Sequence, residues 1–230
     1  MTFSELLLII TGIAATIGAY LLARYVQGRY PIIHPILISA GLLIAIIIAA
    51  DIPLEAYAVG GEWLSMLLGP ATVALGVPIY KHREQIAQQL KPIIISIVCG
   101  SVIGIVSVAF MLWVLTDAQE IILSMLPKSV SSPISIEITK VLQGVPELAA
   151  VFSVCTGLFG SVFGITILHK FGFRDDMSIG LAMGTAAHGI GTARCLANSE
   201  EQGSFSGLAM GLAGVITSIL FVPIYMWLIP

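Results

Sequence analysis

The residues with the clearest chemical potential lie in one glycine-rich segment, from Gly184 to Arg194. Thr185 and Thr192 supply hydroxyls there, and His188 supplies an imidazole, among residues that are otherwise small or apolar. Charged groups in apolar surroundings are costly and usually face a cavity or a partner. Because imidazole, guanidinium and hydroxyl groups all donate hydrogen bonds, the segment predicts a binding site for a small anion. Arg194 would supply positive charge, and His188 a neutral donor or a proton-linked switch.

Glycine is expected to interrupt the helix in the same segment. Gly189 and Gly191 weaken helix continuity and expose backbone groups, which a membrane tolerates only where protein or water satisfies them. The free N–H groups at the start of a half-helix attract anions. Two alternatives stay open: Arg194 extends from the end of its helix to the membrane surface, and His188 is a buried packing residue.

A second segment combines helix breakers with a hydroxyl group. It contains Gly69 and Pro70, then Thr72, and finally Pro78. Proline removes an amide donor and interrupts the hydrogen bonds of a helix. We predict a helix break near Gly69 and Pro70, with Thr72 beside the anion; the alternative is an ordinary proline kink.

The third segment, residues 117–147, is too polar and too rich in proline for an ordinary membrane span. Lys128 and Ser129 precede a predicted helix in which Ser132 is the N-cap and Pro133 takes the first position. A lysine and serines beside a helix N-terminus predict an anion-binding or gating hairpin, unless the segment is an exposed surface turn. The predicted substrate-binding residues of the chain are Thr72, Lys128, Ser129, Thr185, His188, Thr192 and Arg194.

The composition predicts an all-α integral membrane protein. The chain is 57% hydrophobic and only 10% charged, with a mean hydropathy of +1.02, whereas soluble domains are about 25% charged. A spanning helix needs about 20 mostly apolar residues. We predict one integral-membrane domain, residues 1–230, with about seven transmembrane helices at 5–23, 32–50, 63–80, 92–115, 148–169, 177–197 and 204–229. No nucleic-acid-binding charge pattern, enzyme motif or metal-ligand spacing accompanies them, so we expect no nucleic-acid partner, no enzyme activity and no metal or other cofactor.

Lysine and arginine in short loops predict the orientation, because cytoplasmic loops are enriched in them. Residues 81–91 and 170–176 contain these bases and are predicted to be cytoplasmic, whereas 51–62 and 198–203 contain none and are predicted to lie outside. The N-terminus is then outside and the C-terminus cytoplasmic. This arrangement requires 117–147 to enter and leave on the same side, as a re-entrant or interfacial hairpin.

The two halves of the chain show a weak internal similarity. Gly69 and Gly184 each lie in a short run of small residues, and they are 115 residues apart, half of the chain length of 230. The loops around the two runs have opposite charge, so the second half is expected to be inverted. We predict two inverted repeats, about 1–115 and 116–230, each with one discontinuous helix. Such repeats are typical of secondary transporters.

Together the three segments resemble one family of bacterial membrane proteins, the CidB/LrgB autolysis modulators or antiholin-like proteins. That family also includes the plant plastid glycolate/glycerate translocator. Ser131 and Ser132 stand where the family often has two threonines, which preserves the hydroxyls. The matching strings are Leu68–Leu75 with Pro78–Tyr80, Leu126–Val130 with Pro133–Ile134, and Gly180–Ala186 with His188–Arg194.

The resemblance implies one of two functions. Some members export or take up small carboxylates, so we expect alternating-access transport of small monocarboxylates, such as pyruvate, glycolate, glycerate or lactate, across a bacterial cytoplasmic (inner) membrane. The alternative is an antiholin-like regulator of murein hydrolase export and autolysis, acting with a small holin-like membrane partner. We also expect a homodimer in the lipid bilayer, with H+ and Na+ as the candidate coupling ions.

Overall fold

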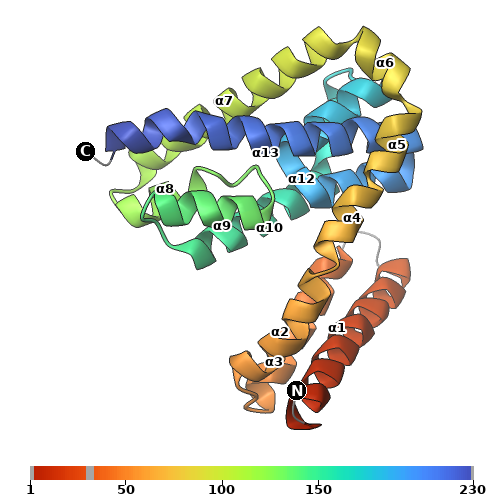
Figure 1. Ribbon diagram of the computed structural model, residues 1–230, viewed down its shortest axis with the longest axis vertical. Coiled ribbons are helices and arrows are strands. Elements are labelled where there is room, and N and C mark those ends of the chain that lie inside the picture. The colour runs from red at the N-terminus through yellow and green to blue at the C-terminus, as the bar shows by residue number, and fades with distance from the viewer. Residues whose placement is uncertain (1–2, 30–33, 229–230) are drawn as a thin grey trace. The chain divides into compact units, whose positions relative to one another are not determined.

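Every regular element in the described part of the chain is a helix, which confirms the predicted all-α architecture. The computed structural model describes residues 3–29 and 34–228 (Figure 1). The chain divides into two compact units, Met1–Ala74 and Leu75–Pro230. The residues that form the pocket described below all belong to the second unit.

In the first unit, helix α1 packs against both α2 and α3. The contact between α1 and α3 is close because it is made by two glycines: a Cβ on Gly60 would lie 2.7 Å from the Cα of Gly12. The hydroxyls of Thr16 and Tyr57 share a hydrogen bond of 2.9 Å across the same contact. The helices of this unit are α1 (Phe3–Arg29), α2 (Pro35–Ala49), α3 (Leu54–Ser65) and α4 (Leu68–Ala74).

The apolar stretch from Leu54 to Lys81 is helical but interrupted twice, at residues 66–67 and at Leu75. Proline explains both positions, since Pro70 cannot donate to the carbonyl of residue 66 and Pro78 cannot donate to that of residue 74. The interruptions therefore precede the prolines by three to four residues. Gly69 and Pro70 themselves lie in the first turn of α4, and Pro78 lies inside α5.

The second unit is built around α7 and α13, which run in parallel (Figure 1). Ile93, near the start of α7, packs with Phe205 near the start of α13. Ile105 and Phe221, farther along the same two helices, belong to a second core cluster. The helices of this unit are α5 (Gly76–Lys81), α6 (Arg83–Gln88), α7 (Leu90–Leu115), α8 (Gln119–Met125), α9 (Ser132–Val141), α10 (Pro146–Phe159), the π-helix η1 (Gly160–Gly164), α11 (Ile165–Lys170), α12 (Asp176–Asn198) and α13 (Glu200–Leu228).

Five helical stretches of the described chain are long and apolar enough to cross a membrane. The predicted span at 32–50 corresponds to the shorter α2, of 15 residues, and the predicted span at 177–197 corresponds to α12, which is not among the five. The five stretches are Leu6–Arg29, Leu54–Lys81, Leu90–Leu115, Pro146–Lys170 and Glu200–Met226.

Helix α12 is a re-entrant hairpin and not a membrane crossing, which corrects the predicted span. A straight helix of its 23 residues would be about 35 Å long. Instead Ser199, directly after α12, donates a hydrogen bond of 2.7 Å to the carboxylate of Asp176, its first residue. The chain reverses at His188, whose φ of 38° and ψ of −132° are not helical. The arms, 176–187 and 189–198, are each too short to span the roughly 30 Å hydrocarbon core.

The α8–α9 segment reaches into the same unit from the other end. It begins after Leu115, the last residue of α7, and ends at Pro146, the first residue of α10. Helices α8 and α9 have 7 and 10 residues, so they are about 10 and 15 Å long and too short to cross. The geometry matches the predicted hairpin, with the one difference that the N-cap of α9 is Ser131 rather than Ser132.

The reversal of α12 changes the predicted topology. It places residues 170–176 and 198–203 on one side, and Lys81 forms an ion pair with Glu200, so 81–91 lies on that side too. We call it the basic side, and we call the side of Leu115 and Pro146 the opposite side. The prediction that 198–203 lies across the membrane from 81–91 is wrong. Because α13 runs from the basic side to the opposite side, the prediction of a cytoplasmic C-terminus together with cytoplasmic basic loops is also wrong.

Sided cysteine labelling tests this topology. We expect an impermeant maleimide to label Gln89→Cys and Asn198→Cys from the same side of the membrane and Asp117→Cys from the other side. The background carries Cys99→Ala and Cys155→Ala, because these thiols are exposed, and keeps Cys195, which is buried. If Asn198→Cys is instead labelled from the same side as Asp117→Cys, α12 crosses the membrane as a straight span and is not a hairpin.

Candidate functional site

The α8–α9 segment presents a lysine at its tip. After α8 the chain passes through turns from residue 126 to 129 before α9 begins. The Nζ of Lys128 donates a hydrogen bond of 3.2 Å to the Oγ of Ser129, and both side chains are partly buried. Val130 is buried in the core cluster that also contains Leu142 and Phe221. The cluster holds the tip in place while leaving the ammonium group on its surface.

The tip of the α12 hairpin is His188, whose side chain is only 4% exposed. A positive φ is costly for a residue other than glycine and persists only where the surroundings impose it. Gly157 of α10 makes room for the ring, because a Cβ there would lie 2.8 Å from the Cε1 of His188. The Oγ1 of Thr192 donates to the His188 carbonyl (2.8 Å) and also shares a hydrogen bond with Ser206. These contacts hold the reversal at His188 in place through both its ring and its backbone carbonyl.

Both tips meet α10 near Ser153. Its hydroxyl donates a hydrogen bond of 2.7 Å to the carbonyl of Val130. The Nε2 of His188 lies 2.9 Å from the Ser153 carbonyl, and since a carbonyl only accepts, this nitrogen carries the proton. The two hairpins therefore enter from opposite sides and end at one residue of α10.

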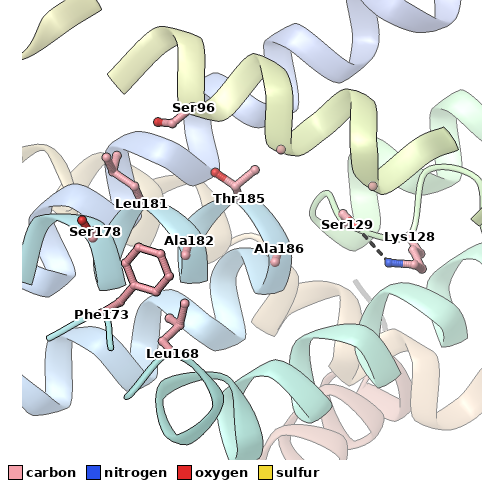
Figure 2. Close-up of a pocket in the computed structure, with 12 residues that line it drawn as sticks. Ser96, Lys128, Ser129, Leu168, Phe173, Ser178, Leu181, Ala182, Thr185 and Ala186 are labelled. Carbon is pink, nitrogen blue, oxygen red and sulfur yellow. Dashed lines mark hydrogen bonds between the residues drawn. The ribbon is translucent and has the colours of Figure 1, made fainter. Parts of the chain in front are cut away.

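A pocket of about 500 Å³ lies between α7, the tip of the α8–α9 segment and the first arm of α12. Figure 2 shows Lys128 and Ser129 at one end and Phe173 and Ser178 at the other. Thr185 lines it between these ends. Since 170–176 is a loop on the basic side, the pocket extends from the hairpin tips toward that side. Its lining residues are Ser96, Gly100, Gly104, Lys128, Ser129, Leu168, Phe173, Ser178, Leu181, Ala182, Thr185 and Ala186.

Three of the predicted binding residues line this pocket: Lys128, Ser129 and Thr185. His188 and Thr192 are buried beside it, in the contacts that fix the α12 tip, and are not part of its lining.

Arg194 and Thr72 do not line the pocket. Arg194 is exposed in the second arm of α12, four residues before its end at Asn198. This position favours the alternative in which its side chain reaches the membrane surface. Thr72 is exposed in the first unit and donates to the carbonyl of Leu68 in its own helix.

The predicted break residues of α12 lie next to the reversal. Gly189 directly follows His188, and both Gly189 and Gly191 are helical. The role of Gly191 is close approach, because a Cβ there would lie 2.6 Å from the Cβ of Ala187 and 2.9 Å from the carbonyl oxygen of Met183 in the other arm.

Several residues of the site were not predicted. Gly100 and Gly104 line the pocket: a Cβ at Gly100 would lie 3.1 Å from Thr185, and one at Gly104 would lie 3.7 Å from the Ser129 hydroxyl. Ser153 is buried in an apolar span, and small polar residues of this kind are common where membrane helices pack.

The charges around the pocket favour an anion. Lys128 is the one charged residue among the described residues that line the pocket, and no acidic residue is among them. Two acidic residues, Asp175 and Asp176, lie close in the chain to lining residues, but neither lines the pocket. Asp175 caps α12: the Ser178 amide donates to it at 2.8 Å and lowers the pKa of its carboxyl. Ser96, Ser129, Ser178 and Thr185 contribute hydroxyl side chains to the lining.

The fold and the site define a multi-pass α-helical membrane protein with two opposed re-entrant hairpins beside a cationic pocket. The LrgB-like family matches residues 16–228, so the chain belongs to this family.

Relatives of similar length support the assignment. The chain is 31% identical to the holin-like protein CidB of Staphylococcus epidermidis, over 94% of this chain and 96% of that one. It is 34% identical to an uncharacterized protein of Haemophilus influenzae, over 89% and 90% of the two chains. It is 32% identical to YwbG of Bacillus subtilis, over 90% and 93%. No solved structure shows significant similarity to the chain.

Proposed function

We propose that the protein is a carrier of small monocarboxylates, of the pyruvate, glycolate, glycerate and lactate type, that works by alternating access. The observation that carries the proposal is the position of Lys128, at the tip of a re-entrant hairpin and at the inner end of a pocket that extends to the basic side. Substrate sites of secondary transporters lie near the membrane midplane beside discontinuous helices.

The polar groups of the pocket suit a substrate with one negative charge. Lys128 would pair with the carboxylate, while Ser129 and Thr185 would bind the keto or hydroxyl group next to it. A second carboxylate would find no second cation among the described lining residues. We therefore expect monocarboxylates to be preferred over dicarboxylates of similar size.

The orientation, the coupling ion and the oligomeric state belong to the same proposal. The positive-inside rule makes the basic side cytoplasmic, so the pocket would face the cytoplasm and α13 would end outside. The N-terminus stays outside by the same rule, because Arg24 and Arg29 lie at the far end of α1. H+ and Na+ remain the candidate coupling ions, and a homodimer remains the expected assembly.

Uptake into proteoliposomes containing only this protein tests the proposal. We expect labelled pyruvate or glycolate to accumulate above the level of protein-free liposomes and to be displaced by unlabelled lactate. The neutral methyl ester of the substrate and the dicarboxylate succinate should compete weakly, because the first lacks the charge that Lys128 recognises and the second has one charge too many. Equal competition by the methyl ester would contradict the proposed role of the lysine.

The second candidate function is regulation of murein hydrolase export with a holin-like partner. The observation in its favour is the printed name of several relatives, holin-like protein CidB. This function predicts no uptake by the protein alone. If uptake appears only after a holin-like protein is added, the carrier requires a partner; if it never appears, the regulatory function gains support.

A further inference from the structure

Ser153 is the residue at which the two hairpins are joined. It lies in the middle of α10, and its side chain is fully buried. Its hydroxyl binds the Val130 carbonyl at 2.7 Å, and its carbonyl accepts from His188 at 2.9 Å. The hydroxyl also lies 3.3 Å from the same imidazole nitrogen. One residue therefore holds a backbone group of one tip and a side chain of the other.

The two contacts of Ser153 hold different hairpin tips. The His188 ring sits over Gly157 and bonds to the α10 backbone, so the tip of α12 is attached to α10 through several groups. The Val130 carbonyl is bound by the Ser153 hydroxyl alone among the hydrogen bonds described for it. Loss of the hydroxyl would therefore weaken the hold on the α8–α9 tip, which the core cluster of Val130, Leu142 and Phe221 still supports, while leaving the α12 tip in place.

The pocket lies on the basic side of this junction. It reaches the loop of Phe173 on the basic side. Toward the opposite side the α8–α9 segment covers it, with Leu126, Val130 and Leu142 packed against Phe221 of α13. Access from the opposite side requires the tip to part from Ser153.

We propose that Ser153 is a positioning residue that holds the α8–α9 tip closed over the pocket, so that breaking its hydrogen bond to Val130 is a step in opening the pocket to the opposite side. This opening would be one step of the proposed transport function, and the proposal rests on that function. Its structural content, a gate whose closed state the Ser153 hydroxyl stabilises, is measurable without substrate.

The test measures how often the tip opens. Val130→Cys is introduced into the background that lacks Cys99 and Cys155. This substitution changes the buried side chain but keeps the backbone carbonyl that Ser153 binds. An impermeant maleimide is added on the opposite side. Ser153→Ala is expected to raise the labelling rate at position 130 by about 2- to 10-fold, since one neutral buried hydrogen bond shifts a two-state equilibrium by roughly that factor.

Two controls separate a gate from general loosening. Thr156→Ala removes a hydroxyl from the same helix that bonds only to the carbonyl of Phe152, and should leave the rate unchanged. Cys195, whose side chain is fully buried, reports on loosening of the whole unit and should stay unlabelled. Equal rates in Ser153→Ala and the parent protein, or a parallel rise at Cys195, would overturn the proposal. A positive labelling result without any uptake in liposomes would overturn the carrier function and leave the gate standing.

Discussion

Replacing Lys128 with glutamine is expected to weaken monocarboxylate binding by about 10- to 100-fold. A hydrogen bond to a charged group contributes roughly 1.5 to 3 kcal/mol, and each 1.4 kcal/mol corresponds to a factor of ten in affinity. Glutamine keeps a hydrogen-bond donor on a side chain one atom shorter, but it removes the charge. Lys128 is also the charged residue of the described pocket lining, so no neighbouring cation there would compensate.

The matched control is Lys140→Gln. Lys140 lies on α9, in the same α8–α9 segment, but it is exposed and paired with Glu137 at 2.7 Å. Binding is measured by the displacement of labelled pyruvate from purified protein, and transport by uptake into liposomes, both normalised to folded protein. If Lys128→Gln and Lys140→Gln bind the substrate equally well, the anion site does not lie at the α8–α9 tip.

The sequence predicted those pocket residues whose side chains are polar or charged in an otherwise apolar chain. Lys128 and Ser129 lie in a polar, proline-rich segment inside an apolar chain, and Thr185 lies in a glycine-rich run. Polar groups in such surroundings require partners, and the structure brings these three to one cavity. The short α8–α9 segment was predictable for a related reason, since neither of its helices has the length of a span.

The reversal of α12 was not predictable from hydropathy. A hairpin with two short arms and a single span contain the same number of residues. Helix α12 is less apolar than the five candidate spans, but low hydropathy does not show where a chain reverses. The difference lies in one residue with a positive φ and in contacts between distant positions, such as Asp176 with Ser199 and Lys81 with Glu200. For the same reason Arg194 was assigned to the anion site, although it lies near the end of an arm and outside the pocket lining.

Ser153 was missed because nothing in its local sequence distinguishes it from other small polar residues in membrane helices. Its importance comes from Val130 and His188, which are 23 and 35 residues away in the chain. Only the fold brings these groups to the same point. Gly100 shows the same difficulty, since packing glycines and pocket-lining glycines look alike in sequence.

Gly191→Ala and Gly189→Ala are expected to change the stability of the protein in opposite directions. In the hairpin, an alanine Cβ at position 191 would lie 2.6 Å from the Cβ of Ala187 and 2.9 Å from the Met183 carbonyl, so the arms would have to separate. Overpacking of this kind costs about 1 to 3 kcal/mol. At position 189 the nearest atom is the sulfur of Met210 at 3.7 Å, an ordinary contact.

The two substitutions distinguish the hairpin from a continuous helix because a continuous helix predicts the same sign for both. Alanine in a helix interior is more favourable than glycine by about 0.5 to 1 kcal/mol, so in a straight α12 both variants would be stabilised. In the hairpin Gly189 is the first residue of the second arm, where alanine has room and gains about 0.4 to 1 kcal/mol by restricting the unfolded chain. Gly191→Ala instead lowers the midpoint of thermal unfolding, on the order of 2 to 12 °C by the scaling of soluble domains. The measurement is the fraction of monodisperse protein that survives heating in detergent, followed by size-exclusion chromatography. If Gly191→Ala survives heating as well as Gly189→Ala does, the arms of α12 do not pack together and His188 does not lie at the tip of a hairpin.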